Sequence, residues 1–254
     1  MIVAGALDWL LEPENPSARY LTLRLLQDLP ETSPEAAAAR EAIPAWGPAR
    51  EILDAQWPGG YWVRPGVGYS PKHKATVWQI IFLSALGTPC TRSLERACAH
   101  IMDHSRLGDG RFSAGKTASE AVACLNGNLI RAMLHLGFKD PRLASSIEAL
   151  ARMVERDGFR CRYNATKPAP RRMRDGLPCA WGAIKVLGAF GAVPVAERST
   201  AVQAGIEAGV EMIIGSELAV GGFPTATRRS PLWHRFGFPL GFTSDLLEAM
   251  LVLG

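Results

Sequence analysis

The stretch Gln56-Trp57-Pro58-Gly59-Gly60-Tyr61-Trp62 places a glycine-rich turn directly before two aromatic residues. Similar turns recur along the chain, at Asp109-Gly110-Arg111-Phe112, Asp157-Gly158-Phe159 and Gly221-Gly222-Phe223. Each turn follows a helix-like segment and precedes an apolar segment that ends in glycine, at Gly87, Gly137, Gly191 and Gly254. The intervals between these glycines are 50, 54 and 63 residues. A period of this size indicates an array of supersecondary units.

The segments between the turns are of two kinds, both rich in Ala, Leu and Arg, which favours helices. One kind is apolar on all sides, as in buried helices: Trp78–Leu86, Leu129–Leu136, Gly182–Phe190 and Asp245–Leu253. The other kind is amphipathic, as in helices exposed on one face: Leu94–Leu107, Arg142–Arg156 and Arg198–Glu217. The pattern predicts an all-α protein, an α/α toroid of about 4–6 helical hairpins with an inner and an outer ring.

The prediction covers residues 1–254 as a single domain, because the Pro- and Gly-rich connections suit loops rather than linkers. The Asn126-Gly127-Asn128 sequence is predicted to be a polar turn that caps the inner helix after it. The final inner-type segment has no outer partner after it. Either the first helices cover it, or the chain is truncated at the carboxyl terminus.

Composition excludes several classes of protein. Of the 254 residues, 48% are hydrophobic and 20% are charged, as in ordinary globular proteins. No apolar run reaches the roughly 18 residues of a membrane span. The formal charge of +4 is too small to indicate nucleic-acid binding. Five cysteines and an amino terminus without the features of a signal peptide predict a cytoplasmic protein.

The Gln56–Trp62 stretch resembles the Gln-Trp repeat motif of squalene and oxidosqualene cyclases, and the later turns resemble degenerate copies of it. The chain from about Tyr20 onward therefore looks like a bacterial-type member of the terpenoid cyclase and protein prenyltransferase superfamily. In this motif the glutamine bonds to free backbone groups at a neighbouring helix end, and the aromatic ring packs on the next repeat. We therefore expect the motif to act as a structural staple.

Several potential metal ligands lie just ahead of inner helices, at similar distances from the terminal glycines. Cys124 is 13 residues before Gly137, Cys179 is 12 before Gly191, and Cys161 enters the loop that leads to Cys179. Thiolates and imidazole are the ligands of tetrahedral zinc, so Cys124, Cys161, Cys179 and His234 are the predicted zinc site. The alternative is that these cysteines are small apolar core residues.

Prenyltransferases carry a similar arrangement of Asp and Cys before one inner helix and His on a later one. Asp175, Cys179 and His234 resemble it, although the Asp and Cys are four residues apart here and two apart in the family. Squalene-type cyclases use an Asp-rich motif, and no Asp-x-Asp-Asp sequence occurs in this chain. Asp245 is the candidate catalytic acid if Thr243 or Ser244 caps the last helix. The alternative is that Asp245 itself is a helix cap.

Two further groups of residues suit an isoprenoid ligand. The loop around Arg171, Arg172 and Arg174 resembles the basic rim that receives a diphosphate, the alternative being a solvated surface loop. Aromatic residues near the starts of the inner helices suit an isoprenoid chain or a packed core: Trp62, Trp78, Trp181, Trp233 and Phe242.

The resemblance thus implies a central apolar pocket for a hydrophobic small molecule or an isoprenoid diphosphate, used for zinc-assisted transfer or for cyclisation. The alternative hypothesis is a non-catalytic toroid that binds a peptide or lipid.

Overall fold

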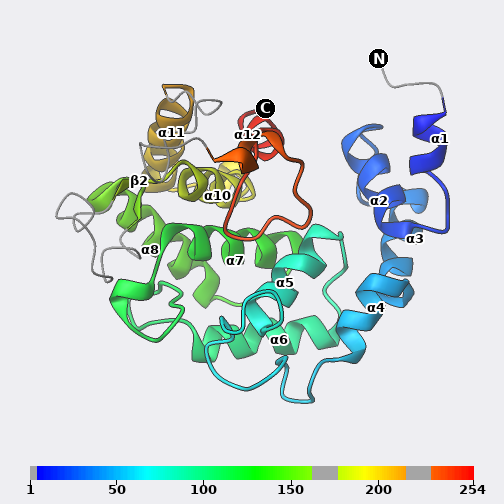
Figure 1. Ribbon diagram of the computed structural model, residues 1–254, viewed down its shortest axis with the longest axis horizontal. Helices are drawn as coiled ribbons and strands as arrows, with labels where there is room; N and C mark the ends of the chain where they lie inside the picture. Colours follow the sequence, from blue (N-terminus) through cyan, green and yellow to red (C-terminus); the bar gives the residue numbers. More distant parts are fainter. Residues whose placement is uncertain (1–4, 162–176, 216–229) are drawn as a thin grey trace.

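The computed structural model describes residues 5–161, 177–215 and 230–254. It is mostly helical, which confirms the predicted all-α class (Figure 1). The helices are α1 (Ala6–Leu10), α2 (Pro16–Leu25), α3 (Pro34–Ala42), η1 (Ile43–Ala45), α4 (Gly47–Asp54), α5 (Thr76–Ala85), α6 (Arg92–His104), η2 (Ala118–Glu120), α7 (Ala123–Leu136), α8 (Arg142–Asp157), α10 (Ala180–Gly191), η4 (Val195–Glu197), α11 (Thr200–Ile214), η6 (Pro231–His234) and α12 (Leu246–Leu253). Two short strands, β1 (Arg160–Cys161) and β2 (Leu177–Pro178), pair antiparallel.

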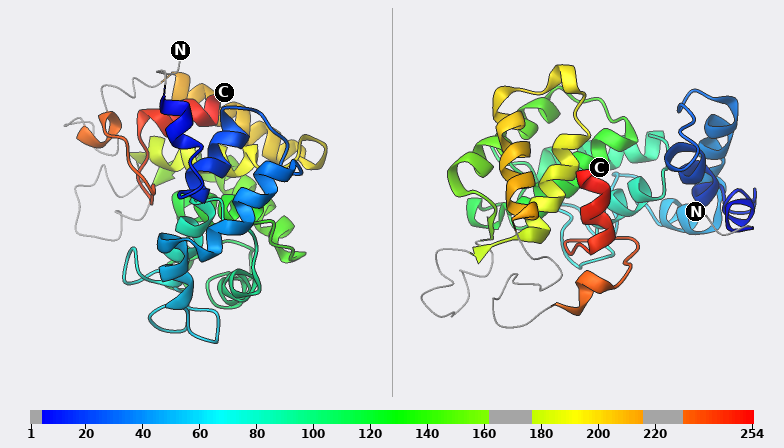
Figure 2. Two further views of the ribbon diagram at one scale, coloured as in Figure 1. Left: turned by 90° about the vertical axis from the view of Figure 1, so that its right-hand side faces the viewer. Right: turned by 90° about the horizontal axis from the view of Figure 1, so that it is seen from above.

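The predicted inner and outer helices are present in the described part of the chain. Helix α7 packs against α5 on one side and α10 on the other, and α10 also packs against α12. Helices α6, α8 and α11 lie against α5, α7 and α10, respectively, as the outer layer. Figure 1 and the two views of Figure 2 show these hairpins following one another along a curve. The closure of this curve into a toroid stays a prediction.

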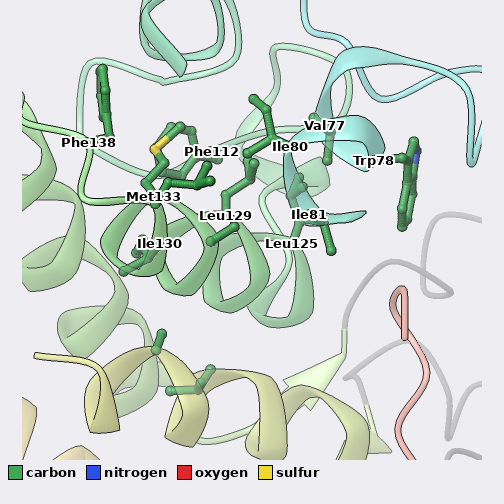
Figure 3. Close-up of a cluster of buried hydrophobic side chains, with 14 of the residues drawn as sticks. Val77, Trp78, Ile80, Ile81, Phe112, Leu125, Leu129, Ile130, Met133 and Phe138 are labelled. Carbon is green, nitrogen blue, oxygen red and sulfur yellow. The ribbon is translucent and has the colours of Figure 1, made fainter. Parts of the chain in front are cut away.

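The core lies where the inner helices meet. Figure 3 shows the part of it between α5 and α7, where Ile80, Leu129, Ile130 and Met133 are wholly buried together with Phe112 of an aromatic turn. Burial on both sides explains why α5, α7 and α10 are apolar on all sides, whereas the predicted inner helix α12 keeps Leu247, Met250 and Leu251 exposed. No helix within the described ranges is both long and apolar enough to cross a bilayer.

The aromatic turns explain how one hairpin is fixed to the next. Gly60 has a φ of 79°, and a Cβ there would lie 2.5 Å from the Arg96 carbonyl oxygen of α6. Gly110 has a φ of 97°, and its Cβ would lie 2.9 Å from the Ser145 carbonyl oxygen of α8. Both turns therefore press backbone to backbone on the next outer helix, at positions where only glycine fits without strain.

The glutamine of the first turn has the stapling role that its motif predicts. Gln56 Nε2 donates to the Ser93 carbonyl oxygen at 3.0 Å, and the Ser93 hydroxyl donates to Gln56 Oε1. Ser93 lies in the first turn of α6, so the bond ties the end of α4 to the start of the next outer helix. The Tyr61 ring lies 5.3 Å from His100 of α6, centroid to centroid.

The backbone of each of these two turns is also hydrogen-bonded to an inner helix. The Trp62 N–H donates to Thr76 Oγ1 of α5 at 3.1 Å. In the next repeat the Phe112 N–H donates to Asn126 Oδ1 of α7 at 2.7 Å, and Asn126 Nδ2 donates to the Phe112 carbonyl at 2.9 Å. In both repeats, a polar side chain near the start of the inner helix thus forms hydrogen bonds with the backbone of the extended turn, whose groups would otherwise be unpaired.

The prediction that the Asn126-Gly127-Asn128 sequence caps a helix is wrong. These residues lie inside α7, which begins at Ala123 rather than at Leu129. A Cβ on Gly127 would lie 2.5 Å from the Lys185 carbonyl oxygen, so the glycine allows α7 and α10 to cross closely. The two asparagines use their side chains in long-range bonds to an aromatic turn and to the segment before α12.

Candidate ligand site at the mouth of the inner helices

The structure brings together three of the predicted zinc ligands. Cys124 lies in the first turn of α7, and Cys179 caps α10, with its Sγ accepting the Gly182 N–H at 3.2 Å. Cys161 belongs to β1, which pairs with the strand directly before Cys179. The Cys161 and Cys179 thiols are hydrogen-bonded, and both interact electrostatically with Cys124. The three residues therefore form one thiol cluster at the start of α7 and α10.

The environment keeps the thiols of Cys124 and Cys179 protonated at neutral pH. Burial, followed by the neighbouring Cys161, raises the pKa of Cys124 to about 11, and the ammonium of Lys185 opposes this only in part. The hydrogen bond with Cys161 and burial raise the pKa of Cys179 as well. Because the thiolate is the nucleophile and the metal ligand, these two thiols are unreactive without a bound cation or a change of environment.

The thiol cluster has the donor chemistry of a zinc site but not its arrangement. In residues 5–161, 177–215 and 230–254, no three Cys, His, Asp or Glu side chains form a group that could hold a metal ion. His234, the fourth predicted ligand, lies on η6 with an exposed side chain.

A row of aromatic rings crosses the starts of the inner helices. The Trp78 ring of α5 lies 6.4 Å from Phe242, which lies 6.5 Å from Trp181 of α10, and Trp181 lies 6.1 Å from Trp233 of η6. Tyr69 and His73 extend this row beyond Trp78, at 5.3 Å and 5.1 Å. We call these six residues the aromatic row.

Four of the five predicted aromatic residues thus belong to one row, and the fifth does not. Trp62 has a structural position instead, because its Nε1 donates to the Ile52 carbonyl of α4 at 2.6 Å. Trp78 and Trp233 are almost completely buried, whereas Trp181 and Phe242 are half-buried. Of these four rings, Trp181 and Phe242 are therefore the more accessible to a ligand.

A lysine that sequence reasoning overlooked lies on this row. Lys72 Nζ is 4.0 Å from the centroid of the Phe242 ring and 5.9 Å from that of Tyr69, in cation–π geometry. The Pro71-Lys72-His73-Lys74 sequence just before α5 carries the signal, since it places basic residues at the start of an inner helix. The lysine adds a positive charge where the half-buried rings meet solvent.

The segment 230–245, which we call the strap, lies across the starts of the inner helices α5, α7 and α10 before it enters α12 (Figure 1). Asn128 Nδ2 of α7 donates to the Gly241 carbonyl at 2.9 Å, and a Cβ on Gly241 would lie 3.2 Å from the Trp78 ring. The strap thus joins residues of α5, α7 and α10 that are far apart in the sequence. It carries Trp233 and Phe242 into the aromatic row.

Asp245 fixes the end of the strap. Its Oδ1 accepts the Glu248 N–H at 2.8 Å, and its Oδ2 accepts the Gly237 N–H at 2.9 Å. Asp245 is therefore the N-cap of α12, and the alternative in which Thr243 or Ser244 caps this helix is wrong. The carboxylate is the better cap than a hydroxyl because it accepts one N–H group of the helix and one of the strap at the same time.

Two buried polar atoms near the row have no hydrogen-bond partner within the described part of the chain. They are Nε1 of Trp233 and Oγ of Ser244. Trp78 offers a contrast, since its Nε1 donates to the Tyr69 carbonyl at 2.7 Å. Buried donors without an acceptor are rare in native structures, and an unfilled ligand site is one explanation for them.

A buried ionic group lies deeper between the inner helices and was not predicted. Lys185 of α10, with a side chain that is 1% exposed, donates to both carboxylate oxygens of Glu248 of α12 at 2.6 and 2.8 Å. Arg131 of α7 reaches the same carboxylate at 3.3 Å. Burial lowers the pKa of Lys185, while the Glu248 carboxylate opposes this effect. The group connects three inner helices through charge.

The predicted diphosphate-binding residues Arg171, Arg172 and Arg174 lie outside the described residues, as does Asp175. Comparison with protein families, with curated proteins and with solved structures finds no match for this chain. The likeness to terpenoid cyclases and prenyltransferases therefore depends on the repeated motif alone.

Proposed function

We propose that this protein binds a hydrophobic small molecule, isoprenoid-like in its chain and anionic at its head, along the aromatic row. The observation that carries the proposal is the row itself, in which rings from α5, α10 and the strap line up in contact. Flat aromatic faces suit a branched, unsaturated chain, and a few polar groups then fix its orientation. The half-buried rings of Trp181 and Phe242 give the chain a surface to lie on.

Lys72 supports a ligand that carries a phosphate or carboxylate at its head. The ammonium of Lys72 lies at the exposed edge of the row, where it would attract a phosphate or carboxylate. At the other end of the row, Nε1 of Trp233 has no acceptor among the residues that the structure describes. Since Trp233 is buried, a ligand that reaches this atom displaces part of the strap. Asp245 acts in this proposal as a positioning residue for the strap.

The test is a calorimetric titration of the full chain with farnesyl diphosphate, with farnesol and with inorganic diphosphate. We expect farnesyl diphosphate to bind more tightly than either fragment. Lys72→Met should weaken the binding of farnesyl diphosphate by about tenfold, which is the effect of losing one charge-assisted bond. It should leave the binding of farnesol unchanged. Lys74→Met is the matched control, because Lys74 is exposed in the same loop.

A second pair of variants tests the row. Trp181→Ala should weaken all ligands that carry the isoprenoid chain, whereas Trp9→Ala, at a 66% exposed tryptophan of α1, should not. Equal binding of farnesol and farnesyl diphosphate would instead support a module for neutral lipids. Absence of binding by both would overturn the proposal.

A second candidate function adds zinc-assisted transfer of the isoprenoid-like group to a thiol acceptor. The convergence of Cys124, Cys161 and Cys179 favours it, because thiolates are preferred zinc ligands. Bound zinc would supply a deprotonated acceptor thiolate at neutral pH. The Lys185 ammonium is near Cys124 and would stabilise its thiolate, while His234 remains the proposed fourth ligand.

Metal analysis of the purified, reduced protein tests this candidate. About one zinc per chain is expected, with loss of the metal in Cys124→Ala and in Cys179→Ala. Cys98→Ala is the matched control, since Cys98 is wholly buried in α6 and outside the thiol cluster. A zinc content that is negligible, or the same in all three variants, would remove the candidate and leave the binding proposal intact.

A further inference from the structure

The strap exposes two phenylalanines on its outer side. Phe236 is 86% exposed and Phe238 is 66% exposed, one on either side of Gly237. Leu232 is a third exposed apolar residue of the same segment. Both views of Figure 2 show the orange part of the strap at the edge of the described chain. Single apolar residues on a surface need no explanation, but large apolar side chains grouped in this way mark an interaction surface.

The backbone between the two rings is hydrogen-bonded to the rest of the fold. The Gly237 N–H donates to Asp245 Oδ2 at 2.9 Å, which ties this point of the strap to the N-cap of α12. The strap is also attached on both sides of the rings, because Trp233 packs in the aromatic row and the Gly241 carbonyl accepts a hydrogen bond from α7. The fold therefore holds the two phenylalanines outward although the segment that carries them is anchored.

The charges around these rings have one sign. Residues 230–244 contain no acidic residue, and Asp245, which follows them, is buried. Arg235 of the strap is exposed, and the exposed Lys72 lies 4.0 Å from the ring centroid of Phe242 in the same strap. Exposed aromatic rings beside basic side chains suit the surface of a bilayer that contains anionic lipids.

We propose that the strap is a membrane-docking loop, in which Phe236 and Phe238 insert among the headgroups of an anionic bilayer. Aromatic side chains favour this interfacial region, and the basic side chains beside them attract the lipid phosphates. The proposal concerns the outer side of the strap. It is independent of zinc and of the ligand proposed for the aromatic row.

The exposed face of α12 lacks this combination of groups and provides an internal control. Leu247, Met250 and Leu251 are exposed there, but residues 246–254 contain no basic residue. If apolar exposure alone caused binding to lipid, this face would bind as well as the strap. A charge-dependent interaction selects the strap.

The experiment is cosedimentation of the full chain, without added ligand, with two kinds of vesicle. One kind consists of phosphatidylcholine and the other of phosphatidylcholine mixed with phosphatidylglycerol. We expect tighter binding to the mixed vesicles, and we expect added salt to weaken it, because salt screens the attraction between basic side chains and anionic headgroups. Equal binding to both kinds of vesicle, or binding to neither, would overturn the proposal.

Variants assign the binding to the strap. The double variant Phe236→Ser with Phe238→Ser should bind the mixed vesicles at least about tenfold more weakly, because both rings lose their burial in the interface. Arg235→Gln should weaken this binding by about fivefold and leave the weak binding to phosphatidylcholine unchanged. Met250→Ser, at a side chain of α12 that is 71% exposed, is the matched control and should bind like the wild type.

Insertion is measured with the variant Phe236→Trp, whose fluorescence should be quenched by brominated lipid more strongly than that of the wild type. Circular dichroism checks that each variant keeps its helices. Loss of binding in Met250→Ser but not in the double variant, or no additional quenching in Phe236→Trp, would overturn the proposal. So would self-association in light scattering that the double variant abolishes, without binding to vesicles, since the surface would then contact a second copy of the chain. Because no ligand is added, this assay and the titration with farnesyl diphosphate can fail separately.

Discussion

The first two aromatic turns and the last helix are held in different ways. The turns at Gly60 and Gly110 are fixed by glycine contacts with the next outer helix and by a polar side chain of an inner helix. Helix α12 packs on α10 and is held by the Glu248 carboxylate between Lys185 and Arg131. The comparison teaches that neutral hydrogen bonds staple the early repeats, while a buried charge holds the last one.

The surfaces of the two regions differ as well. The core between α5 and α7 is closed, whereas α12 exposes Leu247, Met250 and Leu251 by 45%, 71% and 66%. These side chains lie at i, i+3 and i+4 on one face. Helix α12 therefore keeps one apolar face exposed within the described part of the chain. Its attachment depends all the more on the buried charge.

The largest effect should come from breaking that charge group. Glu248→Ala leaves Lys185 buried without its partner and should lower the free energy of unfolding by about 3–5 kcal/mol. The double variant Lys185→Met with Glu248→Leu replaces charge by apolar volume and should restore most of the loss. Urea unfolding followed by circular dichroism measures both. If the Glu248→Ala variant is as stable as the wild type, the ion pair with Lys185 does not hold α12 in place.

An intermediate effect should come from the staples of the turns. Asn126→Ala removes both bonds to the Phe112 backbone and leaves two buried groups unpaired, so we expect a loss of about 3 kcal/mol. Thr76→Val removes the single bond to the Trp62 N–H in the preceding repeat and should cost about 1 kcal/mol. The same unfolding measurement compares the two. Equal losses would mean that the number of bonds does not set the strength of a staple.

The smallest effect concerns the carboxylate of the second turn. The hydrogen bond from Arg111 lowers the pKa of Asp109, so the folded state binds fewer protons than the unfolded state. The resulting stability is present above the ordinary carboxyl pKa and is lost as the pH falls through the lower, folded-state value. Because Asp109 is half exposed, the gain is under about 1 kcal/mol.

Unfolding of Asp109→Asn and wild type at neutral pH and at about pH 3 measures this contribution, since the difference should shrink in acid. A difference that grows in acid would contradict the assigned sign. Asp54, which is exposed and forms an i,i+4 pair with Arg50, provides a control substitution to Asn outside the turns.

Much of the architecture was open to prediction because it depends on local pattern. Helix α3 begins at Pro34 and α8 at Arg142, both as expected, because a proline or polar start followed by a regular apolar spacing is a local signal. The start of α7 was missed, since Asn126 and Gly127 look like turn residues in the sequence and only their partners, Phe112 and Lys185, show why a helix needs them.

The candidate site was predictable in part for the same reason. Alignment of the repeats on their terminal glycines predicted that Cys124 and Cys179 lie at the starts of adjacent inner helices. The same alignment placed most of the aromatic residues near these helix starts. Lys72 and the Lys185–Glu248 pair were missed, because a charge before a helix or inside an apolar one gives no sign of its partner on a distant segment.

The sequence by itself determined the helical class, the repeated hairpin and its glycine turns, since these depend on contacts between near neighbours. Only the tertiary structure decided that Asp245 is a cap, that Trp62 is apart from the aromatic row and that Cys161 meets Cys179. The physical reason is that burial, hydrogen-bond partners and charge pairing depend on how segments meet in the folded chain, and no local spacing encodes them.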